Sequence, residues 1–420
     1  MQTQEPTTET PEAVRTTPVA RQPALLAWRR AGQAVLLPFL LTRFMYFILW
    51  YFGGILFTVP NYSPTPVPCH DLLYSLSHWD TTYLLDIAAS GYTTTHNTYF
   101  FPLYPTLIRL FTPLFHHNAL LAGLFLSNIA FLIAVIGVYR LVEMEFESET
   151  AKRAVLYLVI FPSAFFTFLV FNDALLLLFT VFTLYALRRQ HWVFAGLLGA
   201  LATLTDLRGL LLFVVFLYEY GRVLWPVRRE EIRSRQWLMK NLGVLASLLI
   251  PLALVLYMYA VKRAFGDAFA FLHAQSFWNA GFSLPWKGLI QTMRDLLHLP
   301  RLSFVIPHDL IDLSAFLLFL VLLVLCFVGP ERLRRDQWMY PLSGALLLFF
   351  ALLTPARAPS AGLPYDPLAS MDRYVLCIVA GFLLLARFGR RAWFHSTYLL
   401  VALPVTTLLF LLFLTGHWVV

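Results

Sequence analysis

Apolar segments alternate with short polar segments along almost the whole chain, and this pattern predicts an all-α polytopic membrane protein. The apolar segments recur at lengths of about 17 to 25 residues, which suffice for a helix to cross a bilayer. We predict about eleven such transmembrane helices. They lie near residues 35–57, 118–140, 154–171, 174–187, 192–204, 210–225, 241–260, 307–328 and 338–355, with two more after residue 374. A single transmembrane domain therefore covers 35–420, and the polar, Pro- and Thr-rich segment 1–34 is expected to be a disordered cytoplasmic tail.

A long polar stretch, residues 70–105, follows the first apolar segment directly. Its middle has the periodicity of an amphipathic helix. The apolar side chains on one arc of that helix are Leu72, Leu76, Trp79, Tyr83 and Ile87. Asp80 lies inside the same arc, where a carboxylate must be paired, neutralised or put to use. We therefore predict an amphipathic helix in the first outer loop that presents Asp80 as a catalytic candidate and ends at Gly91.

The composition excludes a soluble globular protein, because 59% of the residues are hydrophobic and only 13% are charged. The net charge of +8 does not indicate a nucleic-acid partner. Lys and Arg instead concentrate in loops of alternate parity, as the positive-inside rule describes. This distribution places the N-terminus in the cytoplasm and residues 70–105 outside. We expect an integral, multi-pass protein in contact with membrane lipid, in the bacterial plasma membrane.

Most of the unusual polar residues fall on the predicted outer face, and ionisable residues at membrane depth are candidates for function because they are costly there. They are Asp80, Asp86, Asp173, Asp206, Arg208, Gln275, Trp278, Asp372 and Arg373. Two structural explanations stay open. Asp206 and Arg208 can satisfy each other at the tip of a helical hairpin, and Arg373 can be an ordinary interfacial anchor.

The sequence contains no Walker loop, no GxGxxG opening a helix and no nucleophile elbow. Nucleotide-driven chemistry is therefore unsupported. A divalent metal stays open as a cofactor, because Asp80 and Asp86 are both acidic. Their directions differ by roughly 120° around a helix, which argues against one shared ion.

The sequence HWDTTYLLDIAASGY, followed by FFPLYP, resembles the first-loop signature of the phosphatidylinositol-glycan class V mannosyltransferases and their prokaryotic relatives. Later segments resemble the same family in the same order. They are Phe161 to Phe166, the loop with Gln275, Trp278, Pro285 and Trp286, and Ser370 to Tyr374. The chain departs from the family at Asp173, where Glu is usual. It departs again after Thr205, where Asp206 precedes the arginine, Arg208.

The resemblance implies a C-type glycosyltransferase fold and transfer of mannose, with inversion, from a polyprenyl-phosphate donor. The acceptor hydroxyl, on a glycolipid or glycan, needs a base, for which Asp80 is our candidate. Arg373, and after it Arg208, are candidates for binding the departing phosphate, because a guanidinium forks onto phosphate oxygens. The residues expected to bind substrate are His78, Trp79, Asp86, Asp173, Gln275, Trp278 and Tyr374.

Two other classes stay open. A lipid or glycan transporter or flippase would also suit the proline-broken segment 99–115, which we interpret as re-entrant or interfacial. An inactive scaffold subunit would suit the departures at Asp173 and Asp206. The gathering of polar residues on one face, with Asp80 intact, favours the enzyme.

Overall fold

The computed structural model describes residues 24–58, 68–224, 243–278, 282–301, 303, 305–355, 367–368, 370–417 and 419. Within these ranges every regular element is a helix and none is a strand. The predicted all-α class is therefore confirmed. The predicted tail lies outside the described residues up to position 23, but α1 already begins at Ala24. Apolar residues on both sides of the Arg29–Arg30 pair extend this helix beyond the predicted boundary at 35.

Among the described residues, five helical segments are long and apolar enough to cross a membrane. They are α1 (Ala24–Thr58), α5 (Ala119–Glu145), η6 with α11 (Gly243–Leu248 and Leu249–Phe265), α14 (Val305–Leu325) and α18 (Ala392–Leu414). Three shorter apolar helices are α8 (Trp192–Thr205), α15 (Met339–Leu353) and α17 (Val379–Phe388). A multi-pass membrane protein follows from these elements, whereas the exact count of eleven crossings stays a prediction.

The remaining helices complete the bundle and its ends. They are α2 (Cys69–Tyr74), α3 (Asp80–Ser90), η1 (His96–Tyr99), α4 (Leu103–Phe111), η2 (Thr112–Phe115), α6 (Ser148–Val159), η3 (Ala164–Thr167), α7 (Asp173–Arg188), η4 (Leu207–Leu211), α9 (Leu212–Leu224), α12 (Ala270–Trp278), α13 (Pro285–His298), η7 (Arg335–Gln337), α16 (Met371–Tyr374) and η8 (Val375–Cys377). The predicted crossing at 154–171 is thus broken after α6. Phe161 and Pro162 lie at the break, where a proline cannot continue the helical hydrogen bonding.

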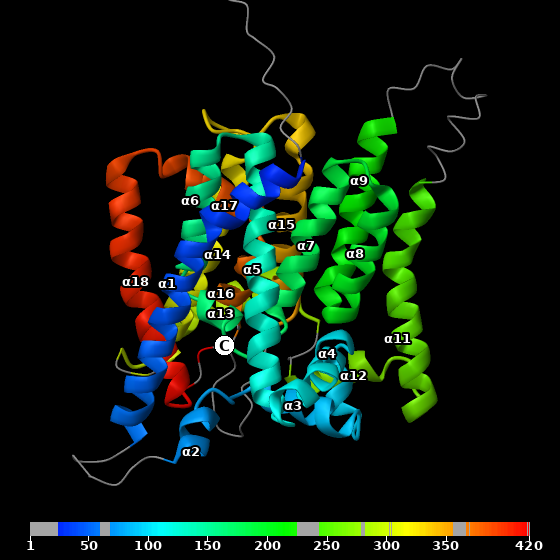
Figure 1. The fold of residues 1–420 in the computed structure, drawn as a ribbon, viewed down its shortest axis with the longest axis vertical. Coiled ribbons are helices and arrows are strands. Elements are labelled where there is room, and N and C mark those ends of the chain that lie inside the picture. Colours follow the sequence, from blue (N-terminus) through cyan, green and yellow to red (C-terminus); the bar gives the residue numbers. More distant parts are fainter. Residues whose placement is uncertain are drawn as a thin grey trace, which may run out of the picture.

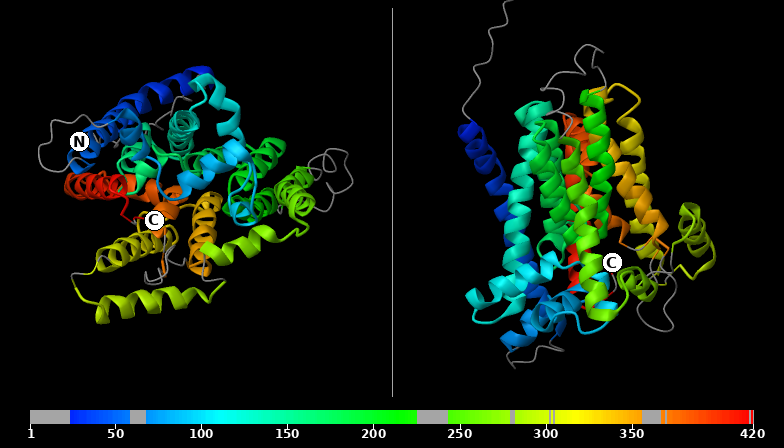
Figure 2. Two further views of the ribbon diagram at one scale, coloured as in Figure 1. Left: turned by 90° about the horizontal axis from the view of Figure 1, so that it is seen from below. Right: turned by 90° about the vertical axis from the view of Figure 1, so that its right-hand side faces the viewer.

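Part of the bundle is built from helices that are neighbours in the chain. α5 packs against α1, α6 and α7, and α8 lies between α7 and α11 (Figure 1). The terminal helices α1 and α18 lie side by side along one edge (Figure 2). The short helices α2, α3, α4 and α12 gather at one end of the bundle (Figure 1). We call this the recess end, because the cavity described below opens beside α3.

The predicted amphipathic helix exists in part, but it is broken in the middle. α2 ends at Tyr74 and α3 begins at Asp80, with Trp79 between them at φ 57°. A tryptophan in the left-handed region cannot belong to a continuous right-handed helix. The prediction of one continuous helix through residues 72–87 is therefore wrong, and Asp80 lies in the first turn of a separate helix. The predicted end at Gly91 is confirmed, since α3 closes at Ser90 and Gly91 has φ 76°.

Candidate active site

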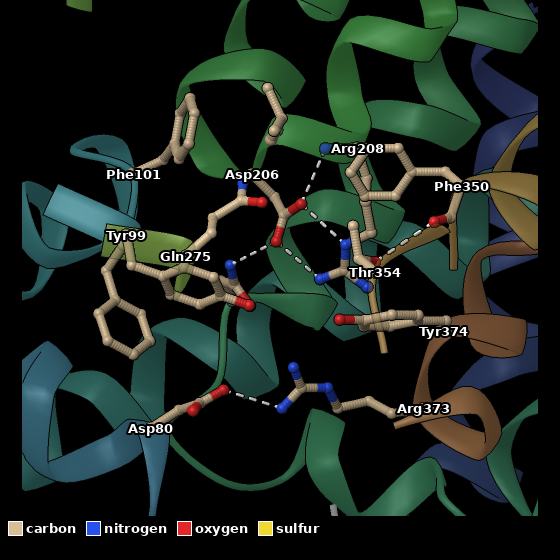
Figure 3. A pocket seen from close by; sticks show the side chains of 13 residues that line it. Asp80, Tyr99, Phe101, Asp206, Arg208, Gln275, Phe350, Thr354, Arg373 and Tyr374 are labelled. Atoms are coloured by element: carbon tan, nitrogen blue, oxygen red, sulfur yellow. Dashed lines mark hydrogen bonds and ion pairs between the residues drawn. The ribbon is translucent and has the colours of Figure 1, made fainter. Parts of the chain in front are cut away.

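A recess with about 540 Å³ of non-protein space, its open mouth included, lies between α3, η1, α12, α15, α16 and the α8–η4 turn (Figure 3). Its lining combines charged groups with aromatic rings. The charged and amide residues are Asp80, Asn172, Asp206, Arg208, Gln275 and Arg373, and the others are Tyr99, Phe100, Phe101, Leu207, Phe350, Thr354 and Tyr374. Segments from the first, middle and last thirds of the chain therefore meet here.

Asp80 enters the recess from the first turn of α3. Thr81, the next residue, donates from its hydroxyl to the carbonyl of Val170 at 3.2 Å and ties this turn to the chain before α7. The Asp80 side chain is 18% exposed, and its Oδ2 lies 2.9 Å from Nη1 of Arg373. Burial raises the pKa of Asp80, and the Arg373 guanidinium opposes this rise without cancelling it. The result is a paired carboxylate that is more basic than an ordinary aspartate.

Arg373 approaches from α16, on the other side of the recess. The backbone around it is fixed from two directions: the N–H of Asp372 donates to Oδ1 of Asp312 at 2.9 Å, and the Ser163 hydroxyl donates to the carbonyl of Asp372 at 2.5 Å. The guanidinium lies 5.3 Å from the ring centre of Phe171, so part of its environment is aromatic. Nη2, the guanidinium nitrogen that contacts neither Asp80 nor Asp173, points into the recess (Figure 3). Arg373 is thus a positioned cation that faces the cavity, rather than a free interfacial anchor.

Arg208 and Asp206 form the wall at the turn between α8 and η4. The Asp206 carboxylate accepts from Nε and Nη2 of Arg208 at 2.8 and 2.7 Å, and also from the Arg208 backbone N–H at 2.9 Å. The guanidinium lies 4.3 Å from the ring centre of Tyr374. The open structural explanation, in which these two residues satisfy each other, therefore describes the observed geometry.

Asp173 joins the two arginines from behind the recess. Its Oδ1 lies 3.3 Å from Nη2 of Arg208, and its Oδ2 lies 3.4 Å from Nε of Arg373. The side chain is 0% exposed and does not line the cavity. Although we expected Asp173 to bind substrate, the structure places it as a counter-ion shared by both guanidiniums. Its role stays a proposal.

Three carboxylates therefore face two guanidiniums in this cluster, which comprises Asp80, Asp173, Asp206, Arg208 and Arg373. Burial would raise the pKa of Asp206, but the Arg208 guanidinium outweighs this effect and holds that pKa below its usual value. Asp80 is shifted in the opposite direction. Two aspartates that share one recess thus differ in basicity, which is how acid and base roles are separated in active sites.

The structure brings five of the predicted residues to the recess: Asp80, Arg208, Gln275, Arg373 and Tyr374. Asp86, His78 and Trp79 do not line it. Asp86 is on the exposed face of α3 and accepts from Asn97 at 3.5 Å. His78 packs edge-on against Phe413 of α18, with ring centres 5.5 Å apart. The side chain of Trp278 lies outside the described residues.

Other lining residues were not assigned to the site from the sequence. Phe100 and Phe101 belong to the first-loop signature and Tyr99 directly precedes its second part, but helical periodicity directed attention to Asp80 alone. Phe350 and Thr354 lie near the end of α15, in what reads as an ordinary apolar crossing. No pattern within that segment distinguishes them.

The donor set does not suit a metal ion. In the part of the chain that the structure describes, no three His, Cys, Asp or Glu side chains gather as metal ligands. Each recess carboxylate contacts a guanidinium instead, and Asp86 is on a different face of α3 from Asp80. The residues present therefore do not fit a metal shared by these two aspartates.

Residues 65–268 match the sequence model of a family described as mannosyltransferase (PIG-V). This match covers the first-loop signature and the Asp206–Arg208 turn, and it confirms the family resemblance that the motifs indicate. No curated protein matches the chain.

Several solved structures are similar to this chain. One is a crystal structure of ArnT from Cupriavidus metallidurans bound to undecaprenyl phosphate, with 15% identity, a TM-score of 0.49, and coverage of 86% of this chain and 62% of that one. Another is the apo oligosaccharyltransferase of Archaeoglobus fulgidus, with 12% identity, a TM-score of 0.46, and coverage of 90% and 56%. The chain thus spans less than two thirds of the length of either protein.

Proposed function

We propose that this chain, which resembles the PIG-V mannosyltransferases over residues 65–268, is a membrane glycosyltransferase of the C-type fold. It transfers mannose from a polyprenyl phosphate to an acceptor hydroxyl on a glycolipid or glycan. The observation that carries this proposal is the pairing of Asp80 with Arg373 at 2.9 Å inside the recess. A base from α3 and a cation from α16 therefore meet inside one recess.

The proposed reaction is a direct displacement at the anomeric carbon. Asp80 accepts the proton of the acceptor hydroxyl as the acceptor oxygen bonds to that carbon. The bond between the carbon and the phosphate oxygen breaks, and the phosphate leaves with the bonding electrons. One displacement of this kind inverts the anomeric centre, so no covalent sugar–enzyme intermediate is needed.

Arg373 binds the donor phosphate in this scheme. The nitrogen that points into the recess can donate to a phosphate oxygen while Nη1 keeps Asp80 in place. Fixed donors of this kind stabilise negative charge as it develops on the leaving group. Buried Asp173 holds the guanidinium from behind, so Arg373 does not have to be ordered again in each turnover.

The rest of the lining suits a sugar. Gln275 offers an amide, Tyr99 offers a ring on the same side of the recess, and Tyr374 offers a ring on the opposite side, next to Arg208 (Figure 3). Aromatic faces with a few directed polar groups are typical of small-molecule sites. We propose that the recess end faces the outside of the bacterial plasma membrane and that the N-terminus is cytoplasmic, as the positive-inside rule indicates.

The test is a transfer assay with purified protein, labelled polyprenyl-phosphate mannose and a crude lipid extract. Wild-type protein should produce a labelled lipid or glycan. Asp80→Asn should lower the rate by about 10² to 10⁴-fold, the usual contribution of a general base. The matched control is Asp71→Asn, which makes the same replacement at an exposed carboxylate on α2. A normal rate in Asp80→Asn would remove Asp80 from the mechanism.

Arg373→Ala tests the other half of the site. It should weaken use of the lipid-phosphate donor more than use of the acceptor, because the phosphate that we assign to Arg373 is the leaving group of the donor. The measurement is the KM for each substrate in turn. Unchanged dependence on the donor would rule out the phosphate role of Arg373.

A further inference from the structure

The Asp206 carboxylate occupies the part of Arg208 that a phosphate would use. A guanidinium recognises phosphate through two parallel N–H donors. On Arg208, both Nε and Nη2 already donate to Asp206, at 2.8 and 2.7 Å. The pair of Arg208 donors that could bind a phosphate, which we call the Nε–Nη2 fork, is therefore already occupied by Asp206 (Figure 3).

The other sides of Arg208 offer no replacement for that fork. Nη2 also donates to buried Asp173 at 3.3 Å, and the face of the guanidinium lies over the Tyr374 ring. Nη1 is fully buried and has no hydrogen-bond partner. A ligand in the recess can reach the guanidinium only by displacing Asp206.

Asp206 is placed so that it can be displaced. Its side chain is 18% exposed and lines the recess, whereas Arg208 is only 3% exposed. Asn172 donates from Nδ2 to Asp206 Oδ2 at 3.1 Å and to the Thr205 carbonyl at 3.2 Å. When Asp206 swings out, this amide stays anchored to the backbone and becomes available to a phosphate oxygen.

We propose that Asp206 sets the affinity for the donor by competing with the donor phosphate for the Nε–Nη2 fork of Arg208. This inference rests on the proposed function and deepens it. Arg373 offers the phosphate one open nitrogen, but a paired contact with a guanidinium fork requires the phosphate to exchange places with a carboxylate. Of the three carboxylates in the cluster, Asp80 is needed as the base and Asp173 is sealed behind the recess, which leaves Asp206.

The exchange also favours one class of ligand. A sugar phosphodiester carries a single negative charge and replaces one carboxylate with no change in the charge of the cluster. A diphosphate would bring additional negative charge beside Asp80, which disfavours it. Asp206 would therefore act as a specificity-determining residue for monoanionic lipid-linked donors.

The test measures binding of the donor, polyprenyl-phosphate mannose, to full-length protein in lipid nanodiscs with no acceptor present, so that no transfer takes place. Asp206→Asn keeps the side-chain oxygen that accepts from the Arg208 backbone but removes the competing charge. We expect its Kd for polyprenyl-phosphate mannose to fall by about tenfold, which corresponds to about 1.4 kcal/mol. Asp206→Glu, which keeps the negative charge of the wild type, should bind the donor with the wild-type Kd. Asp71→Asn again serves as the surface control.

A double-mutant cycle separates competition from a merely structural role. In an Arg208→Gln background, the Asp206→Asn change should no longer tighten binding, because the contested fork is gone. In the transfer assay, Asp206→Asn should lower the KM for the donor more than it changes kcat. A structural role would instead lower the folded fraction and leave the Kd of the folded protein unchanged.

Two results would overturn the inference while the proposed function stands. These are an unchanged or weaker Kd in Asp206→Asn, or tightening that persists without Arg208, in protein whose wild type transfers mannose. Failure of the wild type both to bind polyprenyl-phosphate mannose and to transfer sugar would instead reject the proposed function itself.

Discussion

Two buried ion clusters lie at opposite ends of the helix bundle, and they are built from the same chemistry. The recess cluster joins α3, α7, α16 and the α8–η4 turn around Asp173. The other cluster joins α5, α7, η7 and α15 around Glu145, whose side chain is 1% exposed. Glu145 accepts from both Nε and Nη2 of Arg188, from Gln337 at 2.8 Å and from Tyr340 at 2.9 Å.

The clusters differ in how completely their charges are satisfied. Arg188, the main cation of the Glu145 cluster, also donates to the carboxylate and the carbonyl of Asp336 at 2.8 and 3.0 Å. In the recess cluster, Arg208 retains a buried nitrogen without a hydrogen bond, and Asp80 and Asp206 are each 18% exposed to a cavity. A saturated cluster holds helices together, whereas an incompletely satisfied cluster beside a cavity has capacity left for a ligand.

The largest expected effect comes from exchanging one carboxylate for an amide in each cluster. Glu145→Gln breaks a buried ion pair and should cost about 3 to 5 kcal/mol of stability. It should leave kcat per folded molecule unchanged. Asp80→Asn should instead lower kcat and leave the stability nearly unchanged, because Arg373 keeps Asp173 as a partner. Thermal unfolding in detergent, measured beside the transfer rate, checks both, and a rate loss without destabilisation in Glu145→Gln would contradict the contrast.

The pH dependence of transfer sharpens the role of the recess cluster. Asp80 must be ionised to act as a base, so the rate should fall as the pH drops through its pKa. Burial raises that pKa, so the midpoint should lie above the ordinary aspartate value of 3.8. Below the midpoint, kcat/KM should fall about tenfold per pH unit. Removing the opposing cation in Arg373→Gln should move the midpoint to higher pH, and a lower midpoint would contradict the assignment.

The sequence predicted residues of the recess cluster, but it did not predict the Glu145 cluster. Helical periodicity in the first outer loop directed attention to Asp80, and the structure places Asp80 in the recess even though that helix is broken at Trp79. The meeting of Asp80, Asp173, Arg208 and Arg373 depends on how distant helices pack, which periodicity within a segment does not encode. The Glu145 cluster escaped notice because Arg188, at a helix end, looks like an ordinary marker of the cytoplasmic side.

A smaller effect is expected at the turn that carries Arg208. Gly209 approaches α8 so closely that an added Cβ would collide with the backbone of Ala202. Gly209→Ala should therefore displace Arg208 and cost about 1 to 3 kcal/mol, the usual range for overpacking. The matched control is Gly221→Ala in α9, where a Cβ would meet nothing within 4 Å. Equal unfolding temperatures for the two variants would contradict the close approach.

The smallest effect should have the opposite sign. Ser370 precedes α16 in the left-handed region, with φ 62° and ψ 15°, and its side chain makes no capping hydrogen bond. Its carbonyl, which any residue supplies, accepts from the N–H groups of Arg373 and Tyr374 at 3.1 and 2.8 Å. Ser370→Gly should therefore keep α16 and relieve the left-handed strain, raising stability by up to about 1 kcal/mol. Ser370→Val should lower it, because a branched side chain is disfavoured at positive φ. If both variants unfold at the wild-type temperature, the backbone before Arg373 is unstrained, and the contacts of Asp312 and Ser163 with Asp372 suffice to fix it.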